Sequence, residues 1–153
     1  INFSIYYNFF LLLSIINFKN IKNIEHIKNK ITIYENNLTN TQSLISLLNN
    51  VNPTKIFHLA AQSNVKKSFE NPKDTFQTNI IGTLNLLEAV RKTKIDPVIQ
   101  ISSSSEIYGN VSKNKIPIRE DVEFNAVNPY GISKIATDRL GFQYFRSYGL
   151  KTI

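Results

Sequence analysis

A tyrosine and a lysine lie four residues apart in the segment Tyr130-Gly131-Ile132-Ser133-Lys134. Residues with this spacing share one face of an α-helix, so a helix here would place the ammonium group beside the phenol. A free phenol is a poor base at neutral pH, and a neighbouring positive charge favours its ionised form. The pair is therefore a candidate for base catalysis by a tyrosine.

Two polar segments come at the ends of short apolar runs that are typical of buried strands. His58–Ser63 closes the run Lys55–Leu59, and Ser102–Gly109 follows Pro97–Ile101. Ligands of open parallel sheets bind beyond the carboxyl ends of the strands. The small residues of the first segment would let a flat cofactor approach the backbone, and the hydroxyls of the second could bond an oxygen-rich substrate. On spacing alone, the same residues also fit a polar turn beside a buried alanine pair.

Strands and helices alternate along the part of the chain that must position these side chains. A further strand is predicted over Ile31–Glu35, and helices are predicted over Thr41–Asn49, about 72–92 and about 129–148. In the last helix, Asn128 suits the N-cap, Pro129 the first helical position and Gly149 the stop. The order predicts an α/β fold, a Rossmann-like parallel sheet with helices on both faces.

Two helices carry apolar residues at the spacing expected of a buried face. This face is predicted to consist of Leu44, Leu47 and Leu48 in the first helix, and of Phe76, Ile80, Leu84, Leu87 and Val90 in the second.

Composition excludes several classes of site. The chain has no cysteine and two histidines, so we expect no disulfide framework and no metal site. The net charge of +7 is spread along the chain, which favours anionic partners in general and suits a nucleotide diphosphate. No aromatic-basic motif is present, and we therefore expect no nucleic-acid partner.

The polar segments and the Tyr-Lys helix, in this order, resemble the extended short-chain dehydrogenases/reductases (the NAD-dependent epimerase/dehydratase family). The matching features are Ser104-Ser105-Glu106-Ile107-Tyr108-Gly109 at a strand end, and then Pro129-Tyr130 with Lys134 on a helix. His58–Ser63 and Thr78–Thr83 match the same family in the same order, so the resemblance covers about residues 24–153. Ala61-Gln62-Ser63-Asn64-Val65 and Glu106 are most similar to GDP-mannose 4,6-dehydratases.

The resemblance implies a nucleotide-sugar 4,6-dehydratase that converts GDP-mannose to GDP-4-keto-6-deoxymannose through transient oxidation at C4. Tyr130 would remove the proton of the sugar 4-hydroxyl, and Ser104 would bond the same oxygen. Lys134 would favour the phenolate and bind the nicotinamide ribose. Glu106 would take the C5 proton before water leaves C6.

The resemblance also implies a bound NAD(P), and NADP is favoured if the chain is a true GDP-mannose dehydratase. The expected cofactor-binding residues are Asn37, Leu38, Leu59, Ala60, Ala61, Gln62, Ser63, Asn79, Tyr130 and Lys134. Asn79 is expected to brace the active-site backbone. His58 is interpreted as a satisfied strand residue rather than a catalyst.

Departures from the family pattern predict a fragment. The first glycine is Gly82, so we expect the first strand and its glycine-rich loop to be missing. Asn37 stands where the family has an acidic residue. The C-terminal substrate region would lie beyond Ile153. We therefore expect a partial NAD(P)-binding Rossmann domain over 19–153 that, in isolation, binds NAD(P) weakly and turns over nothing measurable.

Residues 1–18 contain no charge, and their role is left open between a membrane anchor and an edge of a truncated domain. Asn2, Asn8 and Asn17 make a membrane span the less favoured of the two. We expect a cytoplasmic protein that binds a nucleotide sugar and forms a homo-oligomer in its full-length form. Three alternatives remain: a GDP-4-keto-6-deoxymannose reductase, a UDP-sugar 4-epimerase, and an inactive Rossmann fragment that acts as a binding module.

Overall fold

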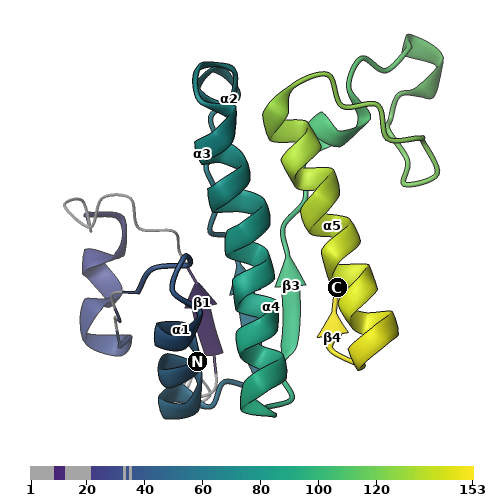
Figure 1. Cartoon of the computed structure of the whole chain (residues 1–153). Coiled ribbons are helices and arrows are strands. Elements are labelled where there is room, and N and C mark those ends of the chain that lie inside the picture. The colour runs from purple at the N-terminus through teal and green to yellow at the C-terminus, as the bar shows by residue number, and fades with distance from the viewer. Residues whose placement is uncertain (1–8, 13–21, 33, 35) are drawn as a thin grey trace.

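A computed structural model describes residues 9–12, 22–32, 34 and 36–153, which form a four-stranded sheet (Figure 1). Its strands are β1 (Phe9–Leu12), β2 (Lys55–His58), β3 (Val98–Ile101) and β4 (Lys151–Thr152), in that order and all parallel. His58 at the end of β2 is paired with Ile101 at the end of β3. The carboxyl ends of both central strands therefore meet at one edge, and the predicted Rossmann-like parallel sheet is confirmed.

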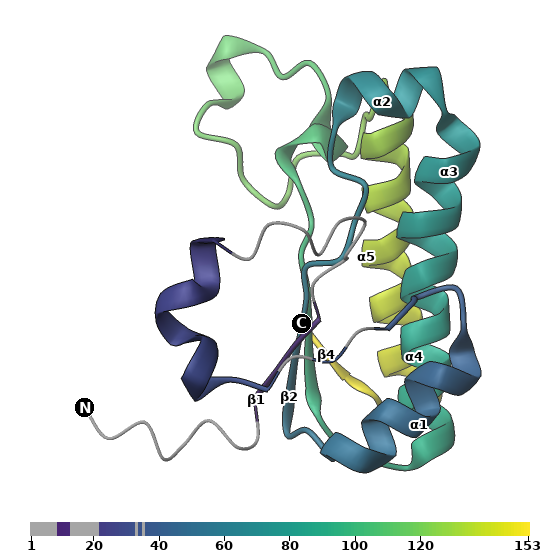
Figure 2. The same ribbon diagram turned by 90° about the vertical axis from the view of Figure 1, so that its left-hand side faces the viewer.

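The described α-helices gather on one face of the sheet. The connections contain α1 (Thr41–Val51), α2 (Val65–Glu70), α3 (Pro72–Phe76), a π-helical turn η3 (Gln77–Ile81), α4 (Gly82–Thr93) and α5 (Pro129–Tyr148). Helices α1, α4 and α5 lie on the same side, and the 3-10 helix η2 (Lys22–Lys30) lies on the opposite side (Figure 2). Crossovers between parallel strands are right-handed. Because each strand follows the previous one in the same direction across the sheet, every crossover helix falls on one face.

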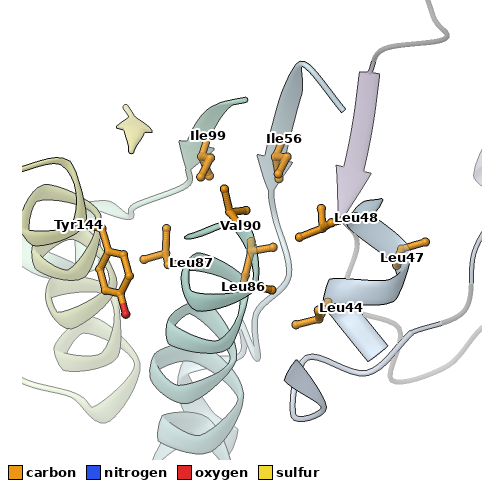
Figure 3. Close-up of a cluster of buried hydrophobic side chains, with 10 residues drawn as sticks. Leu44, Leu47, Leu48, Ile56, Leu86, Leu87, Val90, Ile99 and Tyr144 are labelled. Atoms are coloured by element: carbon orange, nitrogen blue, oxygen red, sulfur yellow. The ribbon is translucent and has the colours of Figure 1, made fainter. Parts of the chain in front are cut away.

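The core lies between this helical layer and the two central strands. Leu44, Leu47 and Leu48 of α1 are buried, as their spacing predicted. Leu44 and Leu48 point toward Leu86 of α4 and Ile56 of β2 (Figure 3). Of the face predicted for the long helix, Leu87 and Val90 are buried, whereas Phe76, Ile80 and Leu84 are only half-buried. A π-helical turn inserts one extra residue into the helix. Phe76, which precedes η3, is therefore rotated away from the face that α4 buries.

The predicted strand Ile31–Glu35 is wrong where it can be compared: Ile31, Thr32 and Tyr34 are not in a strand, and residues 33 and 35 lie outside the described residues. Both sides of β2 are already paired, one with β1 and one with β3. The expectation that the first strand is missing is wrong, since β1 precedes β2 and pairs with it. Strand β1 comes from the uncharged segment 1–18, whose other residues lie outside the described part. Among the described helices, none has the length and hydropathy needed to cross a bilayer.

Hydrogen bonds between polar side chains join α5 to α4. The Tyr144 hydroxyl of α5 donates to Glu88 Oε1 of α4 at 2.8 Å, and the Arg91 guanidinium donates to both Glu88 oxygens at 2.8 Å. The bond from Arg91, followed by that from Tyr144, lowers the pKa of Glu88 to about 2. The helix that carries the Tyr-Lys pair is therefore held to its neighbour by packing and by a charged bond.

Candidate active site

The Tyr-Lys pair lies in the first two turns of α5. Asn128 caps the helix by accepting the Gly131 N–H at 2.7 Å, and Pro129 occupies the first turn, as predicted. Tyr130 and Lys134 are 9% and 6% exposed, so most of each side chain is buried. One helical turn separates them on one face of α5. In the part of the chain that the structure describes, neither the phenol hydroxyl nor the ammonium has a hydrogen-bond partner.

Burial has a direct effect on the lysine. Removing an ammonium from water disfavours its charged form. Burial accordingly lowers the pKa of Lys134. A cationic side chain placed here without an acidic partner is poised for an anionic or hydroxyl-rich ligand.

Ser104 and Glu106 lie beside the start of α5, on the 3-10 helix η4 (Ser105–Tyr108) that follows β3. Ser104 caps η4, its Oγ accepting the Glu106 N–H at 3.2 Å. Glu106 is half-buried, and its Oε2 accepts a bond from Asn128 Nδ2 at 2.6 Å. The strand end with Ser104 and Glu106 is therefore joined directly to the helix end with Tyr130.

Gly131 allows η4 and α5 to approach this closely. A Cβ at this position would meet the Glu106 carbonyl oxygen at 2.7 Å and the Ala126 Cβ at 2.9 Å. The first neighbour is backbone, so it cannot move aside without moving η4. The glycine therefore sets the separation between the carboxylate and the Tyr-Lys helix.

Replacing Gly131 by Ala is expected to destabilise the chain by about 1–3 kcal/mol, the usual cost of overpacking a tight site. Chemical denaturation of the 153-residue chain measures this change. Gly149→Ala is not a suitable comparison because that glycine has a φ of 72°. Ala136→Gly, at a half-buried position of the same helix, controls for general changes in α5. A Gly131→Ala variant as stable as the unaltered chain would contradict the tight contact.

Asn79 joins three segments of the candidate site. Its Oδ1 accepts the Gln62 N–H at 2.7 Å, and its Nδ2 donates to the Gln62 carbonyl at 3.1 Å and to Ser133 Oγ at 2.8 Å. Ser133 Oγ in turn donates to the Tyr130 carbonyl at 2.7 Å. The side chain thus connects the loop after β2 to the turn of α5 that carries Tyr130, which is the arrangement expected of a bracing residue.

His58 extends this network in a single tautomer. The Thr83 hydroxyl donates its proton to the Asn79 carbonyl at 2.6 Å, so it can only accept from His58 Nε2, which lies 2.8 Å away. The proton of the imidazole is therefore on Nε2. His58 Nδ1 is buried and has no hydrogen-bond partner in the described structure. The interpretation of His58 as a satisfied strand residue is thus wrong for one of its two ring nitrogens.

The predicted cofactor-binding residues outside the helices form two groups, one directly after β2 and one before α1. At the end of β2, Leu59 is 46% exposed, Ala60 and Gln62 are buried, Ala61 is half-buried and Ser63 is exposed. Of these residues, Gln62 bonds Asn79, and Asn79 is linked through Ser133 to the Tyr130 carbonyl.

The other two predicted residues are held by different contacts. The Asn37 side-chain oxygen is occupied in its own turn, where it accepts from the Thr39 N–H and hydroxyl at 2.9 and 3.0 Å. Leu38 packs against Gly82, and its carbonyl accepts from Asn85 Nδ2 at 2.8 Å. Leu38 therefore contacts α4, whereas the side-chain oxygen of Asn37 bonds within its own turn.

Three residues of the site were missed from the sequence: Thr83, Asn128 as a partner of Glu106, and Ser133. Thr83 and Asn79 are four residues apart in a predicted helix, so their contact could have been found from spacing. Asn128 and Glu106 are 22 positions apart, and Ser133 and Asn79 are 54 apart. Only the packing of β3, η4, α4 and α5 brings these last pairs together.

The chain is similar in sequence to several known proteins. The family model described as GDP-mannose 4,6 dehydratase matches residues 6–153, which includes β1. A GDP-mannose 4,6-dehydratase of Yersinia enterocolitica is 38% identical over 77% of the chain. A GDP-6-deoxy-D-mannose reductase of Pseudomonas aeruginosa is 35% identical over 66% of the chain. The match covers 32% and 33% of these two proteins, so the chain spans about a third of their length.

A solved structure has a similar fold. A Thermus thermophilus UDP-glucose 4-epimerase in complex with NAD superposes with a TM-score of 0.81 at 28% sequence identity. The superposition covers 93% of this chain and 44% of the epimerase.

Proposed function

Because this chain belongs to the GDP-mannose 4,6 dehydratase family, within the extended short-chain dehydrogenases/reductases, we propose that the whole protein converts GDP-mannose to GDP-4-keto-6-deoxymannose with NAD(P). The observation that carries the proposal is the carboxylate of Glu106, bonded to the cap of the helix that bears Tyr130 and Lys134. A dehydratase needs a base for the sugar C5 in addition to a base for the 4-hydroxyl. A 4-epimerase needs only the second.

The residues at the end of β2 fit the nicotinamide end of NAD(P). Lys134 offers a buried ammonium without a hydrogen-bond partner among the described residues, and Leu59 and Ala61 leave an apolar surface for a flat ring. The pyrophosphate of NAD(P) has no matching glycine-rich loop. The segment 13–21 after β1 lies outside the described residues and contains no glycine, so a glycine-rich loop cannot hold the phosphates there.

In the proposed mechanism, the chain supplies two bases and the groups that hold them. Tyr130 accepts the proton of the sugar 4-hydroxyl, and Ser104 donates a hydrogen bond to the same oxygen. Lys134 holds the nicotinamide ribose and favours the phenolate. The residues Asn37, Leu38 and Leu59 to Ser63 line the cofactor, and Asn79 keeps the Gln62 backbone in place.

Elimination requires the second base. The chemistry supplied by bound NAD(P) is the removal of one hydride from C4 and its return to C6. A ketone at C4 makes the C5 proton acidic. Glu106 removes that proton and passes it to the hydroxyl group at C6, which leaves as water. C5 then takes up a proton from solvent as C6 is reduced. Every group involved comes from η4 or from the first two turns of α5.

Incubation of the whole protein with GDP-mannose and NADP tests the proposal. We expect a product that is lighter by one water and that carries solvent deuterium at C5 when the reaction is run in D₂O. Conversion of UDP-glucose to UDP-galactose without loss of mass would instead identify an epimerase. NADPH-dependent consumption of GDP-4-keto-6-deoxymannose alone would identify a reductase, which the similarity to the Pseudomonas enzyme makes the second candidate. Cofactor binding without any turnover would support a binding module.

A further inference from the structure

Both the oxygen and the NH₂ group of the Asn128 side-chain amide form hydrogen bonds. Its Oδ1 accepts the Gly131 N–H at 2.7 Å, and its Nδ2 donates to Glu106 Oε2 at 2.6 Å. A backbone N–H can only donate, so the oxygen of the amide must face Gly131. Its NH₂ group must then face the carboxylate, and the side chain, which is 6% exposed, has one satisfied orientation.

The bond from Asn128 holds Glu106 by one oxygen only. Glu106 Oε1 accepts no hydrogen bond from the residues that the structure describes. A general base must lie within hydrogen-bond reach of the proton that it removes. A glutamate side chain has three rotatable torsions, so its carboxylate reaches one place reliably only when a neighbour fixes it.

We propose that Asn128 is a positioning residue that aims Glu106 Oε1 at the sugar C5. The inference rests on the proposed dehydratase function, in which Glu106 is the C5 base. Asn128 also begins the helix that carries Tyr130, two residues further on. One side chain therefore sets the distance between the base for the 4-hydroxyl and the base for C5. This matters for a reaction in which one proton leaves the oxygen on C4 and the other leaves the neighbouring C5.

The capping role and the positioning role can be separated by substitution. Aspartate and serine cap a helix about as well as asparagine. Neither offers an N–H to Glu106, and aspartate also places a second negative charge beside it. Alanine removes the cap and the donor together. The series Asn128→Asp, Asn128→Ser and Asn128→Ala therefore distinguishes loss of the carboxylate contact from loss of helix stability.

We expect Asn128→Asp and Asn128→Ser to fold with denaturation midpoints near that of the unaltered whole protein. Their kcat for GDP-mannose should fall by about a hundredfold, the lower range for loss of a positioned base, while KM changes by less than about threefold. Exchange of the C5 proton with D₂O should fall in parallel. Asn40→Asp is the matched control. Asn40 caps α1 by accepting the Ser43 N–H at 3.0 Å, and its side chain bonds no carboxylate among the described residues. It should leave kcat unchanged.

A kcat within about threefold of the unaltered value in Asn128→Ser, with normal stability, would show that Asn128 only caps the helix. Should Asn128→Asp fail to fold, Asn128→Ser decides the question. The contact itself is tested without activity: in the 153-residue chain, Glu106→Gln should shift the Asn128 Nδ2 proton resonances. If the unaltered protein does not dehydrate GDP-mannose, the proposed function fails even where this shift is observed.

Discussion

Replacement of Tyr130 by Phe is expected to lower the kcat of the whole protein toward GDP-mannose by a factor of about 10² to 10⁴, the range for a lost general base. Phenylalanine fills the same buried position, since Tyr130 is 9% exposed and its hydroxyl bonds none of the described residues. The fold should therefore be retained. Binding of NAD(P) should change little, because Lys134 and the loop after β2 are untouched. Steady-state kinetics and cofactor titration measure the two quantities separately.

Tyr108→Phe is the matched control for this substitution. Tyr108 lies on η4, close to the same site, and its ring makes an edge contact with Phe124 at 5.9 Å between centroids. Loss of its hydroxyl should leave kcat within about twofold of the unaltered protein, as is usual for changes away from the chemistry. A Tyr130→Phe enzyme with comparable activity would remove the tyrosine from the mechanism. It would also leave the buried Lys134 without the role assigned to it.

The elements that could be predicted from the sequence are those whose signals are local. Helix α5 begins after Asn128 and ends at Gly149 because a side-chain cap and a left-handed glycine act within a few residues of each end. The buried face of α1 follows from the spacing of Leu44, Leu47 and Leu48. Strands β2 and β3 were recognisable as short apolar runs between polar loops.

Other parts of the fold depend on contacts that no local pattern encodes. Ile31–Glu35 has the composition of a strand, yet the two sides of β2 are occupied by β1 and β3. The π-helical turn η3 inserts a residue where the sequence reads as continuous helix, which moves Phe76 and Ile80 out of the core. In the first case the available strand partner decides the structure, and in the second the backbone hydrogen-bond pattern decides it. Residue type alone decides neither.

The candidate site shows the same division. The spacing of Tyr130 and Lys134 was informative because residues four apart lie on the same face of a helix. The contact between Asn128 and Glu106, and the network through Asn79 and Ser133, join residues from different elements. Such contacts require the packed structure.

The His58 ring predicts a pH dependence of stability. Burial first, and then the charge of Lys134, lower the pKa of His58 to about 4, whereas an unfolded histidine titrates near 6.5. Between these two pH values, the unfolded chain binds more protons than the folded chain does. Stability must therefore fall as the pH falls from 6.5 to 4. A difference of 2.5 pKa units, from 6.5 minus 4, corresponds to about 3 kcal/mol over this window.

His58→Gln isolates this contribution. Glutamine can still donate an N–H toward Thr83 Oγ1, but it does not titrate, so the difference in unfolding free energy between the two chains should change by about 3 kcal/mol between pH 7 and pH 4. Urea denaturation of the 153-residue chain at several pH values gives this difference, and the titration of Glu88 cancels because it occurs in both chains.

His26→Gln, at an exposed histidine, is the control and should leave the pH profile of stability unaltered. Parallel pH profiles for the unaltered and His58→Gln chains would mean that the imidazole is not held neutral.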